Sequence, residues 1–141
     1  MKRTTGFFCA LLLATVAVAT CKSDDVFGPD DIFGTYRLVS IAGDTVPAPF
    51  RTPEAGWVMA GTIELRRVGS AGGGSVADRE SWRPPGGVPE DIVLPGQFEV
   101  DRDSVWLHVG DPYLCGGTYS RSRIVCEMTV TGHEWVWERT Q

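Results

Sequence analysis

Short runs of alternating apolar and polar residues dominate the chain after residue 32, and glycine and proline separate them. The runs are rich in valine, isoleucine, threonine, tyrosine and tryptophan, which favour strands, and no long segment has helical periodicity. The pattern predicts eight strands, at residues 33–41, 57–68, 75–83, 96–100, 104–109, 117–120, 123–129 and 134–140.

Alternation is clearest in the first and last of these strands. Tyr36 and Leu38 share one phase, with Ser40 next in it. In the last strand Trp135 and Trp137 share one face, and Glu134 and Glu138 lie on the other. Residues 100–105 and 129–134 read as hairpin turns, and Gly132 can supply the positive φ of the second. Because an open meander of this length exposes two edges, we predict an all-β fold, a small antiparallel up-and-down barrel of about eight strands.

Three stretches resemble a known family: "FGTYRLVSIAGDTVPAPF", "GQFEVDRDSVWLHV" and the terminal "EWVWERT". They are similar to the opening, the middle hairpin and the closing strand of small bacterial lipocalin-like envelope proteins. The resemblance spans most of residues 33–140 and implies a lipocalin-like barrel. Its motifs consist mainly of core alternation, so it bears on fold more than on function.

The middle of the chain departs from that pattern. Residues 69–97 hold seven of the 17 glycines and four of the nine prolines, and we predict that this segment is mostly loop. Two interpretations follow. It is either a mobile flap over the barrel mouth or an insertion between strands that has no binding role.

The first twenty residues have the three zones of a secretory signal: basic Lys2 and Arg3, an apolar stretch, and small residues at the end. One possible cleavage follows Ala19. The other precedes Cys21, where "VATC" resembles the lipobox of bacterial lipoproteins, whose cysteine receives a diacylglyceryl group and further acyl chains such as palmitate. We therefore expect a signal peptide at 1–20, a lipid-anchored tether at 21–31 and a β-barrel domain at 32–141.

The number of cysteines that remain after cleavage bears on which of the two cleavages occurs. Without the leader the chain keeps Cys21, Cys115 and Cys126, an odd number for an exported protein. Lipidation of Cys21 leaves two cysteines that can form a disulfide in an oxidising compartment; the alternatives are a free thiol at Cys21 and two buried thiols at the other positions. Lys22 after the cysteine resembles lipoproteins of the outer membrane, so the expected location is the bacterial cell envelope and the expected partner is a membrane.

The net charge of the mature chain bears on which kinds of partner it can bind. Removing Lys2 and Arg3 from the 13 basic residues leaves 11 against 18 acidic ones, so the mature net charge is −7. Such a chain is repelled by phosphates, and we expect no nucleic-acid partner. The 121 residues after the signal suit one domain.

Catalytic signatures are missing from the sequence. His108 and His133 have no partner at catalytic or metal-ligand spacing, and "DRDS" at 101–104 lacks the later ligands of a calcium loop. His108 alternates out of phase with its apolar neighbours and should face solvent. We therefore expect neither an enzyme nor a cofactor or metal site.

Five tryptophans are the remaining candidates for function: Trp57, Trp82, Trp106, Trp135 and Trp137. Inside a barrel they would either fill the lumen or line an apolar pocket. Two functions stay open. The first is a lipid-anchored module that binds a small apolar ligand, and the second is a structural or interaction protein of the envelope with a solid barrel.

Overall fold

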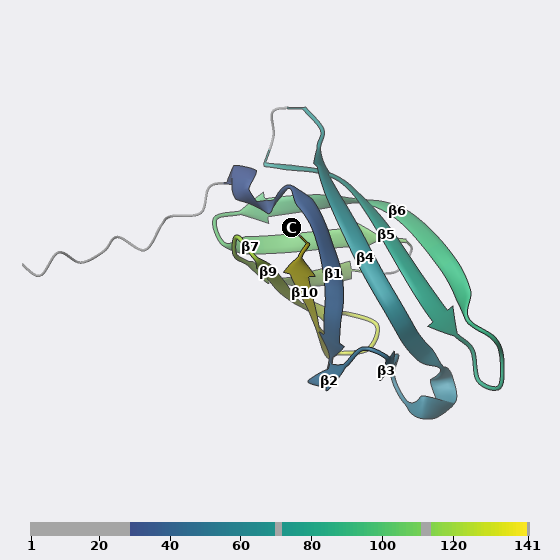
Figure 1. Cartoon of the computed structure of the whole chain (residues 1–141). Coiled ribbons are helices and arrows are strands. Elements are labelled where there is room, and N and C mark those ends of the chain that lie inside the picture. The colour runs from purple at the N-terminus through teal and green to yellow at the C-terminus, as the bar shows by residue number, and fades with distance from the viewer. Residues whose placement is uncertain (1–28, 70–71, 111–113, 141) are drawn as a thin grey trace, which may run out of the picture.

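The computed structural model describes residues 29–69, 72–110 and 114–140, and its main feature is one antiparallel sheet that closes on itself (Figure 1). Eight strands form the wall, in the order in which they follow one another along the chain: β1 (Gly34–Ile41), β4 (Trp57–Arg67), β5 (Gly73–Arg83), β6 (Glu90–Asp101), β7 (Ser104–Val109), β8 (Leu114–Tyr119), β9 (Arg123–Met128) and β10 (His133–Arg139). The all-β prediction and the eight-stranded up-and-down barrel, the architecture of lipocalin-like proteins, are confirmed.

β1 closes the barrel because it pairs with a strand on each side. Along β10 it pairs from Tyr36 to Ile41, and along β4 only its first residues pair, from Gly34 to Arg37. Beyond Arg37 the strands β1 and β4 are separated by two short strands, β2 (Asp44–Thr45) on β1 and β3 (Ala48–Pro49) on β4, followed by a 3-10 turn, η2 (Pro53–Ala55). These additions surround what we call the open end of the barrel.

A bulge in β1 corrects one predicted detail. Leu38 pairs with Trp137 but Ser40 pairs with Val136, so Val39 is an extra residue and the phase changes there. Ile41, rather than Ser40, is therefore the next inward side chain after Leu38 and is buried. Local alternation cannot reveal such a shift, because the shift depends on pairing with the far end of the chain.

The other end, which we call the closed end, is capped by the first described element, η1 (Pro29–Ile32). Ile32 is fully buried there, and the Tyr36 hydroxyl donates a hydrogen bond of 2.8 Å to its carbonyl. Arg139, near the end of β10, donates to the carbonyls of Asp31 and Phe33, the latter at 2.8 Å, and its guanidinium lies 5.3 Å from the Tyr36 ring centre. The last strand therefore ties the first turn onto the barrel.

The prediction that residues 69–97 are mostly loop is wrong. This part of the chain contains β5 and the first half of β6, which form a long hairpin with paired residues from Gly73–Glu99 to Trp82–Glu90. Only residues 84–89 connect the two strands. The segment is thus neither a loop-like flap nor an unstructured insertion.

The structure explains why glycine and proline occupy strand positions in this hairpin. A Cβ at Gly74 would lie 2.0 Å from the Arg66 carbonyl oxygen, and one at Gly96 equally close to that of His108, so both mark points where neighbouring backbones approach. Pro95 precedes the first β6–β7 pair, Gly96–Val109, so its missing N–H falls where β6 pairs with β5 alone. Composition alone cannot separate such strand positions from loop positions.

Candidate functional site

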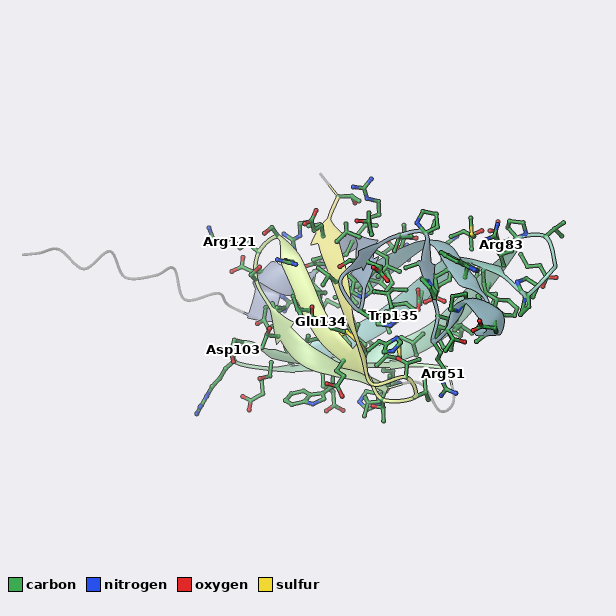
Figure 2. The ribbon with its side chains drawn as sticks, turned by 90° about the horizontal axis from the view of Figure 1, so that it is seen from below. Arg51, Arg83, Asp103, Arg121, Glu134 and Trp135 are labelled. Carbon is green, nitrogen blue, oxygen red and sulfur yellow. A yellow bond between two sulfur atoms is a disulfide. The ribbon has the colours of Figure 1, made fainter. Side chains whose placement is uncertain are left out.

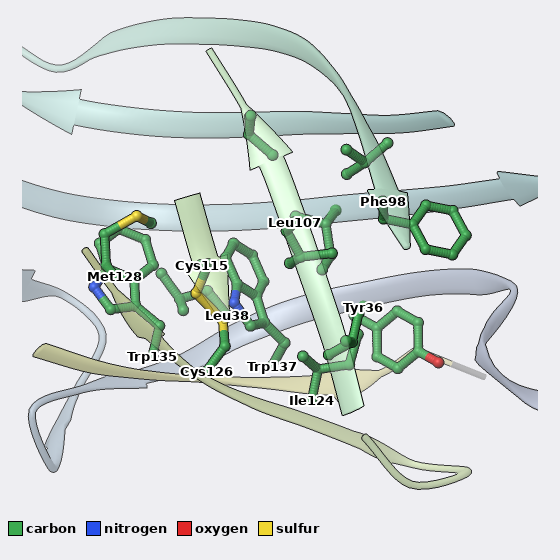
Figure 3. Packing of buried hydrophobic residues seen from close by; sticks show 14 of the residues in the cluster. Tyr36, Leu38, Phe98, Leu107, Cys115, Ile124, Cys126, Met128, Trp135 and Trp137 are labelled. Atoms are coloured by element: carbon green, nitrogen blue, oxygen red, sulfur yellow. A yellow bond between two sulfur atoms is a disulfide. The ribbon is translucent and has the colours of Figure 1, made fainter. Parts of the chain in front are cut away.

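A cavity of about 360 Å³ occupies the open half of the barrel. The closed half is filled by packed side chains, among them Tyr36, Phe98 and Ile124, at the opposite end of the cluster from Met128 and Trp135 (Figure 3). The cavity is lined by residues from most strands of the wall and from the segment after β3: Phe50, Arg51, Ala55, Ile63, Asp78, Glu80, Trp82, Ile92, Leu94, Leu107, Val109, Cys115, Met128, Trp135 and Trp137. Apolar and aromatic side chains predominate, as in small-molecule sites.

The aromatic part of the lining comes from β10 and from the segment between β3 and η2. Trp135 and Trp137 are both buried, with ring centres 6.0 Å apart, and Phe50 stands edge-on to Trp135 at 6.2 Å. Both tryptophans lie on one face of β10, as predicted; the structure shows that this face points inward, while Glu134 and Glu138 are exposed. Gly61 of β4 permits this packing, since a Cβ there would lie 3.3 Å from the Trp137 ring.

Three of the five tryptophans that were candidates for ligand binding border the cavity. Trp82, Trp135 and Trp137 line the cavity, whereas Trp57 and Trp106 do not. Trp106 is 37% exposed on the outside of β7, whose inward residues are Val105, Leu107 and Val109. Trp57 lies 5.7 Å from the Arg83 guanidinium. The prediction that His108 faces solvent is confirmed by the same alternation on β7.

The predicted disulfide joins Cys115 of β8 to Cys126 of β9, with the Cα atoms 5.5 Å apart. The two strands are neighbours, and both cysteines are buried on the inward face beside the tryptophans (Figure 3). The alternative of two buried free thiols is therefore wrong. The bridge fixes the β8–β9 side of the cavity wall. Cys21, the predicted lipidation site, lies outside the described residues.

Two carboxyl groups lie in this apolar lining, and sequence reasoning missed them. Asp78 and Glu80 of β5 share the inward phase with Val76 and Trp82, while Arg79 between them is exposed. Pairing places Asp78 between Ile63 of β4 and Leu94 of β6, both apolar. We call Asp78 and Glu80 the carboxyl pair. The available signal was their shared phase with Val76 and Trp82 in the predicted strand 75–83.

Burial controls the protonation of the carboxyl pair. Asp78 is 4% exposed, and its pKa is raised from 3.8 to about 8 by burial first and then by the charge and hydrogen bonding of Glu80. Burial likewise raises the pKa of Glu80, from 4.5 to about 7. Near neutral pH the pair therefore holds at least one proton in the empty cavity.

No cation balances the pair within the described part of the chain. Neither carboxyl forms an ion pair there, and the Asp78 Oδ1 atom is buried without a hydrogen-bond partner. Among the described residues that line the cavity, Arg51 is the one basic residue, and it is exposed at the open end, where its guanidinium donates to the Val130 carbonyl. Figure 2 shows Arg51 at the end opposite to Asp103 and Arg121, with Trp135 inside the barrel.

The described residues contain no group of three or more histidine, cysteine, aspartate or glutamate side chains that could hold a metal ion. No helix in the same part of the chain is both long and apolar enough to cross a membrane. Comparison with protein-family models, with curated proteins and with solved structures finds no match for this chain. The cavity is therefore the feature of the molecule from which a function can be inferred.

Proposed function

We propose that this protein is a binding module that takes up a small molecule with an apolar body through the open end of its barrel. The observation that carries the proposal is the cavity of about 360 Å³ lined by Trp82, Trp135 and Trp137. Its volume lies within the range of roughly 300–1,000 Å³ of small-molecule sites. The alternative function, a structural or interaction protein of the envelope, was expected to have a solid barrel. In a solid barrel, side chains would fill this half as they fill the closed half.

The expected affinity is modest. Burying about 200 Å² of apolar ligand surface at roughly 25 cal/mol per Å² contributes some 5 kcal/mol before the entropy of association is subtracted. Since 5 kcal/mol corresponds to a dissociation constant of roughly 0.2 mM, ligands that offer nothing but apolar surface should bind with dissociation constants in the millimolar range.

We further propose that the barrel is exported and anchored to the bacterial envelope through acylated Cys21, as a lipocalin-like lipoprotein. The "VATC" sequence and the pairing of the other two mature cysteines with each other support this. The described chain begins with η1 at the closed end, so the segment that leads to Cys21 joins the barrel at the end opposite to the cavity. The cavity opening would then face away from the membrane.

Ligand uptake is tested by tryptophan fluorescence of the protein from Cys21 onward, with the neutral probe N-phenyl-1-naphthylamine. Energy transfer from the indoles to the bound probe should saturate, and Trp82→Phe should reduce it. The matched control is Trp106→Phe on the outer wall, which should leave the apparent Kd unchanged. Binding that is equally strong in an Ala55→Trp variant, which narrows the opening, would contradict a site inside the barrel.

Anchoring is tested separately on native protein. Mass spectrometry of the membrane fraction should show acyl chains on Cys21, and Cys21→Ser should move the protein to the soluble fraction. A native soluble form beginning at Thr20 would overturn the anchoring proposal without affecting the binding proposal.

A further inference from the structure

The carboxyl pair is an unusual component of an apolar cavity. Burying a carboxyl group without a full set of partners destabilises the fold, and leucine or valine at positions 78 and 80 would suit the alternation of β5. The Asp78 Oδ1 atom nevertheless has no hydrogen-bond partner and is buried against Ile63 and Leu94. Such a group is explained if its partner is a ligand.

We propose that the cavity selects a protonated amine with an apolar body, whose ammonium group binds the carboxyl pair while the tryptophans enclose the body. This inference rests on the proposed function. An ammonium group offers N–H donors to both carboxyls, and its positive charge replaces the proton that the pair holds when the cavity is empty. The aromatic rings of Phe50, Trp135 and Trp137 suit both a hydrocarbon body and a nearby cation.

The position of the pair along β5 sets the orientation of the ligand. Trp82 lies toward the end of β5 at the open end, Glu80 is two residues deeper and Asp78 four residues deeper. At about 3.3 Å per residue, Asp78 lies roughly 13 Å along the strand from Trp82. The amine would therefore enter first, and the apolar body would lie behind it toward the opening.

Anions and metal ions fit the site less well. A fatty acid would bring a third carboxyl next to the pair, and Arg51 is too far toward the opening to separate them, since its guanidinium is held by Val130 in the turn after β9. A divalent metal ion needs more oxygen ligands than the pair provides, and the described residues offer no third side chain for it.

Isothermal titration calorimetry at pH 8.5 tests the inference with three probes of nearly equal size: 2-phenylethylamine, 2-phenylethanol and phenylacetate. The amine should bind at least tenfold more tightly than the alcohol, and phenylacetate should bind most weakly. Asp78→Asn/Glu80→Gln should remove the preference for the amine and leave the affinity for the alcohol within about twofold. Glu99→Gln/Glu127→Gln, which removes two exposed carboxyls from β6 and β9, is the charge-matched control and should keep the preference.

The outcomes separate the two proposals. Equal binding of amine and alcohol, or tighter binding of phenylacetate, would overturn amine selection and leave the binding function intact. Failure of all three probes and of N-phenyl-1-naphthylamine would overturn both. Displacement of the amine by millimolar Mg²⁺ or Ca²⁺ would also overturn amine selection, because the pair would then be a metal site. If the double variant unfolds, as judged by near-UV circular dichroism, Glu80→Gln alone should still reduce the amine preference.

Discussion

The carboxyl pair should make the empty protein less stable as pH rises. Asp78 has a folded-state pKa of about 8, against 3.8 as its ordinary value, because burial disfavours the charged form. In the unfolded chain the group ionises near pH 4, whereas in the fold it keeps its proton. The folded state then binds more protons, so the free energy of unfolding falls with pH between these two values and levels off above about pH 8.

The magnitude follows from proton linkage. One group that is protonated in the fold and ionised in the unfolded chain lowers the free energy of unfolding by about 1.4 kcal/mol per pH unit. Between pH 5 and 7 Asp78 alone therefore contributes a loss of about 3 kcal/mol, and Glu80, with a folded-state pKa of about 7, adds to it in the same direction. A loss of 3 kcal/mol lowers Tm by roughly 10–20 °C in a domain of this size.

Thermal unfolding of the disulfide-bonded barrel, followed by circular dichroism at constant ionic strength from pH 5 to 8.5, measures this effect. Asp78→Asn/Glu80→Gln has no ionisable group at either position, so its Tm should exceed that of the natural protein by a margin that grows with pH. Glu99→Gln/Glu127→Gln controls for the change in net charge and should follow the natural protein. A Tm difference that stays constant over this pH range would refute the reasoning, because the pair would then titrate alike in both states.

Three further results are expected. Cys115→Ala/Cys126→Ala should lose about 2–3 kcal/mol in urea unfolding, the loop-closure entropy of a bridge between residues 11 apart; an unchanged midpoint would mean that the bridge does not stabilise the fold. Arg139→Met should lose about 2–3 kcal/mol because it removes the charged donor to the carbonyls around η1, whereas exposed Arg123→Met should lose less than 0.5 kcal/mol. If the cavity binds amines, the affinity for 2-phenylethylamine should rise as pH increases from 6 to 8.5, since the carboxyl pair must ionise to bind a cation; a flat profile in calorimetry would contradict this.

Much of the wall of the barrel can be read from local patterns. Seven of the eight predicted strands begin and end within three residues of the observed bounds. They are recognisable because side chains that alternate between core and solvent have a period of two wherever one face of a strand is buried. The exception is β6, predicted from residue 96 but beginning at Glu90, because Pro95 and its neighbours read as loop. The hairpin turns at 101–104 and 129–132 were also recognisable, the second from Gly132 with φ 66°.

The binding site was only partly visible in the sequence. Inward tryptophans on β10 follow from alternation, but alternation alone does not tell whether an inward side chain fills the barrel or borders a cavity. Asp78 and Glu80 were missed for a related reason. Polar residues in a strand usually mark its solvent face, and only the phase shared with Val76 and Trp82 indicates the opposite here.

By itself the sequence determined the fold class and the ranges of seven of the eight strands, because these depend on local periodicity. The cysteine count favoured a bridge between Cys115 and Cys126 but left free thiols open, and the structure decided for the bridge. Tertiary structure alone decided which half of the barrel is hollow and that two carboxyls meet inside it. Those properties depend on how the strands are staggered and closed: the bulge at Val39, the short β1–β4 pairing and the extension of the β5–β6 hairpin beyond β7. Contacts between residues so distant in the chain leave no local pattern from which they could be predicted.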